Sequence, residues 1–272
     1  MKILRRQIRK WKNSLEGRSF VRLQNFQLWS KGTPVRLGYD GTRYFAEDEL
    51  GKIFVASKSR TRLYLKGIKP RLNALADQYF FKEIDIKSGD TVVDCGANIG
   101  ELGLYLHENH PGARYIAFEP APDEFDCLRR NIPDADNRQK ALWHEKDKLT
   151  FYVNPKTADS SLINNTGVEN TIEIDCVRLD KELGDQTVKL LKLEAEGAEP
   201  EALMGCAGLL ERCTYVVVDA GPERGPTQEP TAPEVCNFLF THGFRMRRIL
   251  PGRLIILFER PATDQSKSNG RQ

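Results

Sequence analysis

The sequence lacks the features that would place it among metal-bound, disulfide-rich or membrane proteins. Its six cysteines form no C-x-x-C pair and have no histidines at zinc-ligand spacing. We therefore expect mostly buried, reduced thiols and no metal site, although nearby carboxylates leave a divalent ion open. No run of 18 apolar residues occurs, and the N-terminus has no signal-peptide core, which predicts a soluble, cytoplasmic protein.

The chain also lacks a strong overall charge. It has 41 Lys and Arg against 38 Asp and Glu, a net charge of +3, which is too weak to indicate nucleic acid as a partner. Its 272 residues suffice for one sizeable α/β domain with an appendage, but not for two catalytic domains. By exclusion, these properties favour a small-molecule or glycan substrate.

A third absence is the dinucleotide fingerprint G-x-G-x-x-G. In its place the apolar run 91–93 leads into DCGANIG at 94–100, the pattern of a buried strand followed by a glycine turn and a helix. Asp94 would repel a pyrophosphate but suits a ligand with positive charge and hydroxyl donors, such as S-adenosylmethionine. The alternative is an ordinary turn with an N-capping Asp.

The next acidic candidate is Glu119, 25 residues after Asp94, in the FEP sequence at 118–120. At the end of a second strand, one carboxylate can accept hydrogen bonds from both hydroxyls of a ribose. Alternatively, Glu119 supplies negative charge at the start of a helix that begins with Pro120 and Pro122.

A third acidic segment is KLEAEGAE at 192–199. Glu194 and Glu196 alternate along an expected strand end, which predicts that both project to one side. Such a pair can orient a sulfonium, bind a sugar or accept a proton. A solvated helix start with Glu199 near the dipole is the alternative, but it leaves Lys192 inside an apolar strand unexplained.

A further acid, Asp219, ends another apolar strand before a Gly- and Pro-rich loop. Loops at this edge of a sheet commonly hold the substrate, so Asp219 is a candidate base. Arg224 either grips an acidic group of the acceptor or pairs with Glu223.

The order of elements predicts an α/β fold with a doubly wound, mostly parallel, seven-stranded sheet, because strands and helices alternate. A β insertion at 149–153 and 171–177 interrupts the alternation. The expected helices are 101–107, 123–131, 200–210 and 233–241, and the expected strands are 91–95, 114–118, 139–142, 188–193, 215–219, 244–249 and 254–258.

Residues 1–66 are expected to form an N-terminal appendage. Leu4, Ile8, Trp11 and Leu15 have helical spacing among many cations, which predicts a basic amphipathic helix over residues 1–26, and short β pieces follow between residues 34 and 65. The helix either packs on the main domain or on a second copy, or touches an anionic membrane. We expect residues 67–260 to form the main domain and residues 261–272 a disordered tail.

The segments 90–101, 118–120 and 191–199 together resemble the FkbM family of methyltransferases, and the similarity runs from about residue 67 to 258. The resemblance implies a class I, Rossmann-like methyltransferase fold. It also implies S-adenosylmethionine-dependent O-methylation, often of sugars in polysaccharide, glycolipid or natural-product biosynthesis. Glu194 stands where the family usually has Asp.

The resemblance also implies roles for individual residues. The methionine end of the cofactor would lie against Asp94, Gly96, Ala97, Asn98 and Gly100, the ribose against Glu119, and the adenine near Ala141 and Leu142. In-line transfer to a hydroxyl needs a proton acceptor, for which the candidates in order are Glu196, Glu194 and Asp219, while Lys192 fixes the carboxylates. The alternatives are a nicotinamide-dependent oxidoreductase and a non-catalytic module that binds cofactor or glycan.

Overall fold

The structure, a computed structural model, describes residues 14–152, 161–163 and 170–261. Half of the helix expected over residues 1–26 lies outside these ranges, including Leu4, Ile8 and Trp11, as does the expected tail from residue 262 onward. Within the described ranges, no helix is long and apolar enough to cross a membrane. All six cysteines are free thiols, and five of them are buried, as expected.

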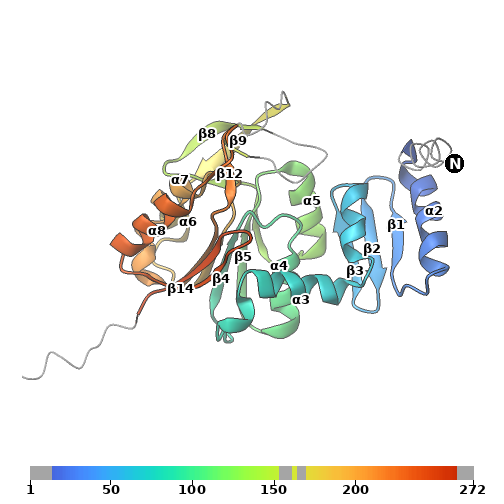
Figure 1. The fold of residues 1–272 in the computed structure, drawn as a ribbon, viewed down its shortest axis with the longest axis horizontal. Helices are drawn as coiled ribbons and strands as arrows, with labels where there is room; N and C mark the ends of the chain where they lie inside the picture. The colour runs from blue at the N-terminus through green and yellow to red at the C-terminus, as the bar shows by residue number, and fades with distance from the viewer. Residues whose placement is uncertain (1–13, 153–160, 164–169, 262–272) are drawn as a thin grey trace, which may run out of the picture.

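A seven-stranded sheet forms the centre of the molecule (Figure 1), with the strand order β14-β15-β11-β10-β4-β5-β6. The strands from β11 to β6 run parallel, and β15 is antiparallel to both of its neighbours. Their bounds are β4 Thr91–Cys95, β5 Arg114–Phe118, β6 Asp136–Arg138, β10 Val188–Leu193, β11 Cys213–Asp219, β14 Arg245–Leu250 and β15 Ile255–Glu259.

Helices cover both faces of this sheet. Val92 packs in one apolar cluster with α3 (Ile68–Gln78), α4 (Glu101–Asn109) and α5 (Pro122–Asn131). Its neighbour Val93 belongs to a second cluster on the opposite face, because successive strand residues point to opposite sides. That cluster contains α6 (Leu179–Leu183), α7 (Glu199–Met204) and α8 (Ala232–Thr241). The predicted doubly wound fold is therefore confirmed.

The strand order reverses between β4 and β10, which are both parallel and adjacent. In a doubly wound sheet the chain leaves these two strands toward opposite faces, so a crevice opens at their carboxyl ends. The fold thus places the segments that follow Cys95 and Leu193 on the two sides of one opening.

The prediction that residues 139–142 form the third strand of the main sheet is wrong. The main sheet ends with β6, and β7 (Ala141–Leu142) leaves it to pair with β9 (Thr171–Val177) in a separate sheet of order β7-β9-β8. The third strand of that sheet, β8 (Asp147–Tyr152), is the other half of the predicted β insertion. The apolar pair in β7 gave the stronger sequence signal, whereas β6 has polar residues because it is an exposed edge.

The N-terminal part forms a small antiparallel sheet beside α5 (Figure 1). It consists of β1 (Arg36–Tyr39), β2 (Tyr44–Asp48) and β3 (Gly51–Val55), covered by α2 (Gly17–Trp29). Its buried residues continue the apolar cluster of α3 to α5, so it packs directly on the main sheet's helices. The division of the chain near residue 66 stays a prediction.

Short elements complete the chain. The 3-10 helices are η1 (Lys58–Tyr64), η2 (Phe81–Glu83) and η3 (Leu210–Arg212), and β12 (Pro222–Arg224) pairs with β13 (Glu229–Pro230) in a small hairpin after β11. The predicted helix at 200–210 ends early, at Met204 of α7, and continues as turns.

We expect Gly103→Ala to lower stability through its effect on Tyr115. A Cβ at Gly103 would lie 2.5 Å from the Tyr115 ring and 2.4 Å from Ile132, so the rigid ring must shift. Overpacking of this kind costs about 1–3 kcal/mol, partly offset by better helix propensity. The urea midpoint of unfolding should fall, whereas Gly252→Ala, with open space around the new Cβ, should leave it unchanged.

Candidate active site

A cavity of about 250 Å³ lies at the carboxyl ends of β4, β5 and β10. It brings together ten of the twelve residues that the sequence suggested, from four segments of the chain. Gly100 and Asp219 do not line it. The ten are Asp94, Gly96, Ala97, Asn98, Glu119, Ala141, Leu142, Lys192, Glu194 and Glu196.

Backbone contacts fix the position of the turn after β4. The N–H groups of Gly96 and Ala97 donate to the Phe118 carbonyl, at 2.9 and 3.1 Å. Gly96 has a φ of +71°, and a Cβ there would lie 2.1 Å from the Glu194 carbonyl oxygen. Only glycine permits this approach of the turn to the end of β10.

Gly100 does not line the cavity, and its expected contact with the cofactor stays a prediction. Its φ is +85°, and a Cβ there would lie 2.7 Å from Leu128 and 2.8 Å from Ile132. Its bare backbone therefore serves the packing of α4 against α5, and it faces away from the cavity. Gly96 therefore permits the contact of the turn with β10, and Gly100 permits the contact of α4 with α5.

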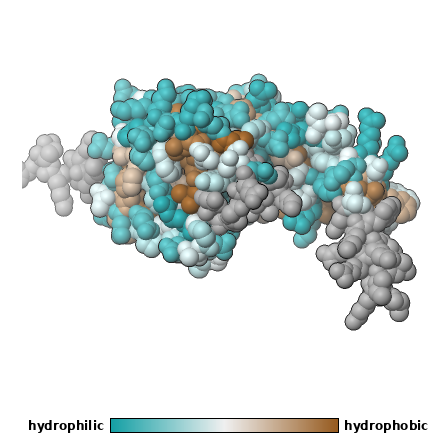
Figure 2. Space-filling model, turned by 90° about the horizontal axis from the view of Figure 1, so that it is seen from above, coloured by the Kyte–Doolittle hydropathy of each residue, from teal (hydrophilic) through white to brown (hydrophobic). Residues whose placement is uncertain are grey.

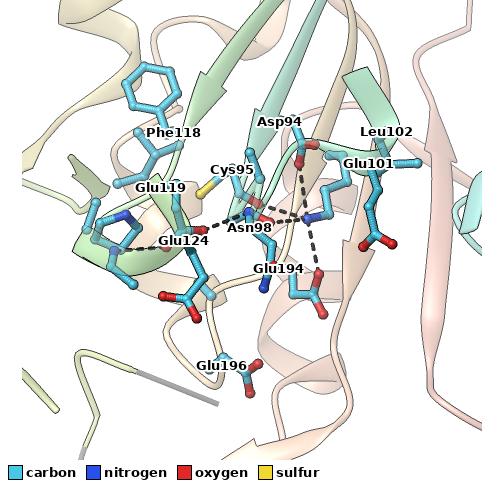
Figure 3. Close-up of a pocket in the computed structure, with 18 of the residues that line it drawn as sticks. Asp94, Cys95, Asn98, Glu101, Leu102, Phe118, Glu119, Glu124, Glu194 and Glu196 are labelled. Atoms are coloured by element: carbon cyan, nitrogen blue, oxygen red, sulfur yellow. Dashed lines mark hydrogen bonds and ion pairs between the residues drawn. The ribbon is translucent and has the colours of Figure 1, made fainter. Parts of the chain in front are cut away.

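Lys192 is the centre of the site. Its side chain is 2% exposed, and its ammonium lies 3.1 Å from both Asp94 Oδ1 and Glu194 Oε2 (Figure 3). It also donates to the carbonyls of Cys95 and Gly96, at 3.2 and 2.8 Å. The predicted pairing of Lys192 with a carboxylate is therefore present, and it explains a cation in an apolar strand.

The charges of this cluster depend on one another. Burial disfavours the charge on Lys192, but Asp94 and Glu194 outweigh that effect and raise its pKa. Burial also works against ionised Glu194, yet Lys192 is the main cause that lowers the Glu194 pKa overall. Glu194 is therefore ionised at neutral pH, with an oxygen committed to the ammonium.

Asp94 is 1% exposed and largely occupied by protein partners. Its Oδ2 accepts a hydrogen bond from the Tyr115 hydroxyl at 2.6 Å, and its Oδ1 faces Lys192. Burial raises its pKa in spite of Lys192. Asp94 lines the cavity, but its carboxylate oxygens are engaged by Tyr115 and Lys192, so its main contact is with the protein.

Glu119 closes the cavity beside the turn. One carboxylate oxygen accepts from the Asn98 N–H at 2.8 Å and the other from the Ala121 N–H at 2.9 Å. Each oxygen keeps a second lone pair, and the side chain lines the cavity. Burial, with a smaller contribution from Glu124, raises the Glu119 pKa to about 8.

The segment after β10 does not stay extended, contrary to expectation. The strand ends at Leu193, and Glu196 has a left-handed φ of +51°. Figure 3 shows the Glu196 side chain at the far end of the loop, away from the ammonium beside Glu194. Glu199 is buried and accepts from the N–H groups of Ala195 and Gly197, so it shapes this loop.

A second acidic cluster lies beside the first, around Arg253 in the turn between β14 and β15. The Arg253 guanidinium lies 2.7 Å from Asp219, 3.5 Å from Glu194 and 3.8 Å from Glu223. Burial, then Glu194, raises the Asp219 pKa to about 6, and burial, then Asp219, raises that of Glu223 to about 8. Arg253 and Glu223 line the cavity.

Arg224 takes neither of its expected roles. Its guanidinium binds Glu201 through two contacts, at 2.6 and 2.9 Å, and donates to the Gly197 carbonyl. A Cβ at Gly197 would lie 2.7 Å from Arg224 Cα, so β12 packs directly on the loop after β10. This contact carries Glu223 to the cavity.

Sequence patterns missed other lining residues. Tyr79, which follows α3, lines the cavity, and its ring lies 5.1 Å from the Lys192 ammonium. Gln78 also lines the cavity, and its Nε2 is buried without a hydrogen-bond partner among the described residues. Arg253 has no sequence signal, since only the fold brings the last hairpin to this point.

We expect Lys192→Met to destabilise the protein by about 3–5 kcal/mol, because it leaves the buried Asp94 and the partly buried Glu194 without their cation. The change is measured as a fall in the urea midpoint, with Lys189→Met on the same strand as the control. Adding Asp94→Asn to Lys192→Met should restore part of the loss. Equal midpoints for both single variants would contradict the central role of Lys192.

Comparison with known proteins identifies the family. The family model described as "Methyltransferase FkbM domain" matches residues 94–246. A 31-O-demethyl-FK506 methyltransferase FkbM from Streptomyces tacrolimicus is 41% identical, over 49% of this chain and 70% of the relative. A hexuronic acid methyltransferase, AglP, from Haloferax volcanii is 25% identical, over 50% of this chain and 57% of the relative.

Among solved structures, a methyltransferase FkbM from Methylobacillus flagellatus aligns with a TM-score of 0.45 and 18% identity, over 65% of this chain and 44% of that one. The family match covers more than half of this chain, from Asp94 through β10 to β14. The chain therefore belongs to the methyltransferase FkbM domain family and is an S-adenosylmethionine-dependent methyltransferase.

Proposed function

We propose that this enzyme methylates a hydroxyl group of a sugar or another hydroxyl-rich molecule, in a polysaccharide, a glycolipid or a natural product. The observation that carries the proposal is the acid-lined cavity at the strand reversal, with Glu119 on one side and Glu194 on the other. The name of one relative, a 31-O-demethyl-FK506 methyltransferase, supports an oxygen acceptor, and the name of the other, a hexuronic acid methyltransferase, supports a sugar-derived acceptor. This substrate class rests on those names and on the acidic lining.

The described residues fit the methyl donor's chemistry. The Gln78 Nε2, which is buried without a hydrogen-bond partner among the described residues, offers a donor at the cavity wall, and the lone pairs that remain on Glu119 can accept hydrogen bonds from hydroxyl groups. When bound, S-adenosylmethionine supplies an electrophilic methyl group on a sulfonium. The residues that would hold it are Gln78, Gly96, Ala97 and Asn98 at the methionine, Glu119 at the ribose, and Ala141 and Leu142 with Phe118 at the adenine.

The acceptor hydroxyl must lose a proton during transfer, and the structure separates the candidate bases. Glu194 is held ionised by Lys192 and is a weak base for that reason. Asp219 lies behind the wall, bound to Arg253. Glu196 and Glu223 line the cavity. We favour Glu223, because its Oε2 is buried without a hydrogen-bond partner among the described residues.

Lys192 and Arg253 act as positioning residues in this proposal. Together they carry two positive charges beside the four carboxyl groups of Asp94, Glu194, Asp219 and Glu223, so carboxyl groups outnumber cations even with Glu223 protonated below its raised pKa of about 8. This excess favours a cationic sulfonium over an anionic group at the same point.

The methyl donor site is tested by calorimetric titration with S-adenosylhomocysteine. We expect binding by the unmutated protein, and a loss of about 2- to 12-fold for Glu119→Gln, because a hydrogen bond between neutral groups contributes about 0.5–1.5 kcal/mol. Glu108→Gln, on the outer side of α4, is the control. Absence of binding by the unmutated protein would refute the assignment of the cavity.

The base is tested by steady-state kinetics with an acceptor found by screening hydroxylated compounds for release of S-adenosylhomocysteine. Glu223→Gln should lower kcat by about a hundredfold or more and leave the affinity for S-adenosylhomocysteine unchanged. Because the Glu223 pKa is raised to about 8, the unmutated rate should rise as pH increases through that value, and the variant should lose this rise.

Two variants complete this design. Glu229→Gln, on exposed β13, should retain full activity. If Glu196→Gln abolishes turnover while Glu223→Gln retains it, the proton acceptor is Glu196, the first candidate from the sequence.

A further inference from the structure

The positive charge of this chain is concentrated at one end. Residues 1–39 contain ten of the 41 Lys and Arg residues but only one of the 38 Asp and Glu residues. This segment therefore carries a net charge of +9, whereas the other 233 residues, with 31 basic and 37 acidic side chains, carry −6. Charge asymmetry of this size is typical of a segment that meets an anionic surface.

Helix α2 is the described part of this segment, and it lies at the outer end of the molecule (Figure 1). Val21 and Leu28 are buried on its inner face. Asn25 fixes the helix to β1, since its amide group donates to the Leu37 carbonyl and accepts from the Leu37 N–H, both at 2.8 Å. The opposite face of α2 is therefore held outward.

That outer face carries two large aromatic side chains. Phe26 is 65% exposed and Trp29 is 76% exposed, and their ring centroids are 6.2 Å apart. Arg22 precedes Phe26 by one helical turn and is exposed with them, as are Arg18 and Lys31 at the two ends of the helix. Figure 2 shows apolar atoms at the surface of this end of the molecule.

The cations around the aromatic pair have no carboxylate partners among the described residues: no ion pair involves Arg18, Arg22 or Lys31 within residues 14–152, 161–163 and 170–261. The one acidic residue of the segment, Glu16, pairs with Lys58. Aromatic rings and unpaired cations on one helix face are the combination that binds the interface of an anionic bilayer.

We propose that the outer face of α2, defined by Arg18, Arg22, Phe26 and Trp29, together with Lys31 in the turn that follows, docks the enzyme on an anionic membrane surface. The aromatic rings enter the boundary between headgroups and acyl chains, and the cations contact lipid phosphates. The remaining basic residues of positions 1–12 add to the attraction by their charge. This proposal is independent of the acceptor proposed above.

The test is co-sedimentation of the full chain with large vesicles of phosphatidylcholine alone and of phosphatidylcholine with 30% phosphatidylglycerol. We expect binding only to the anionic vesicles, weakened by salt. The double variant Phe26→Ser, Trp29→Ser should bind at least about tenfold more weakly. The matched control, Phe240→Ser, removes an aromatic side chain that is 47% exposed on α8 and should bind normally.

Two further measurements make the result decisive. The double variant should keep its urea midpoint, so that lost binding cannot come from unfolding. Vesicle binding that ignores lipid charge, or that is equal in the double variant, would overturn the proposal. So would a dimer in analytical ultracentrifugation that the double variant abolishes, or binding of RNA without binding of vesicles.

Discussion

The site depends on one buried ammonium group. Lys192 lies at the reversal of the sheet, where β10 runs beside β4, and its charge is shared between Asp94 and Glu194 and two backbone carbonyls. A buried cation is costly unless every donor has a partner, so this contact fixes both strand ends relative to each other. The Lys192 ammonium thereby holds the turn at Gly96 and the loop at Glu194 in place.

Close backbone contacts then complete the cavity. Gly96 allows the turn after β4 to meet the end of β10, and Gly197 allows β12 to meet the loop after β10. Both positions have positive φ, so a side chain would be strained as well as crowded. Through these contacts, three segments that are far apart in the chain deliver Asn98, Glu194 and Glu223 to one opening.

The electrostatic character of the opening follows from this arrangement. Carboxyl groups outnumber cations around it, and burial raises the pKa of Glu119 and Glu223, so a bound cation would favour their ionised forms. Such a site favours a positively charged donor and hydroxyl groups, in agreement with the family. Membership in a methyltransferase family also removes the oxidoreductase and the non-catalytic alternatives. The positive charge of the chain is concentrated instead near α2, at the other end of the molecule, where we propose membrane docking.

The sequence by itself determined the alternation of strands and helices, the strand-to-helix turn at Asp94 and the acid at Glu119, because these follow from local periodicity and turn chemistry. It also located most of the cavity, since parallel strands end at one edge. Only the tertiary structure decided which side chains are free: it engaged Asp94 and Glu194 with Lys192, turned Gly100 toward α5, and brought Arg253 to Asp219. Those outcomes depend on contacts between distant segments, which no local pattern encodes.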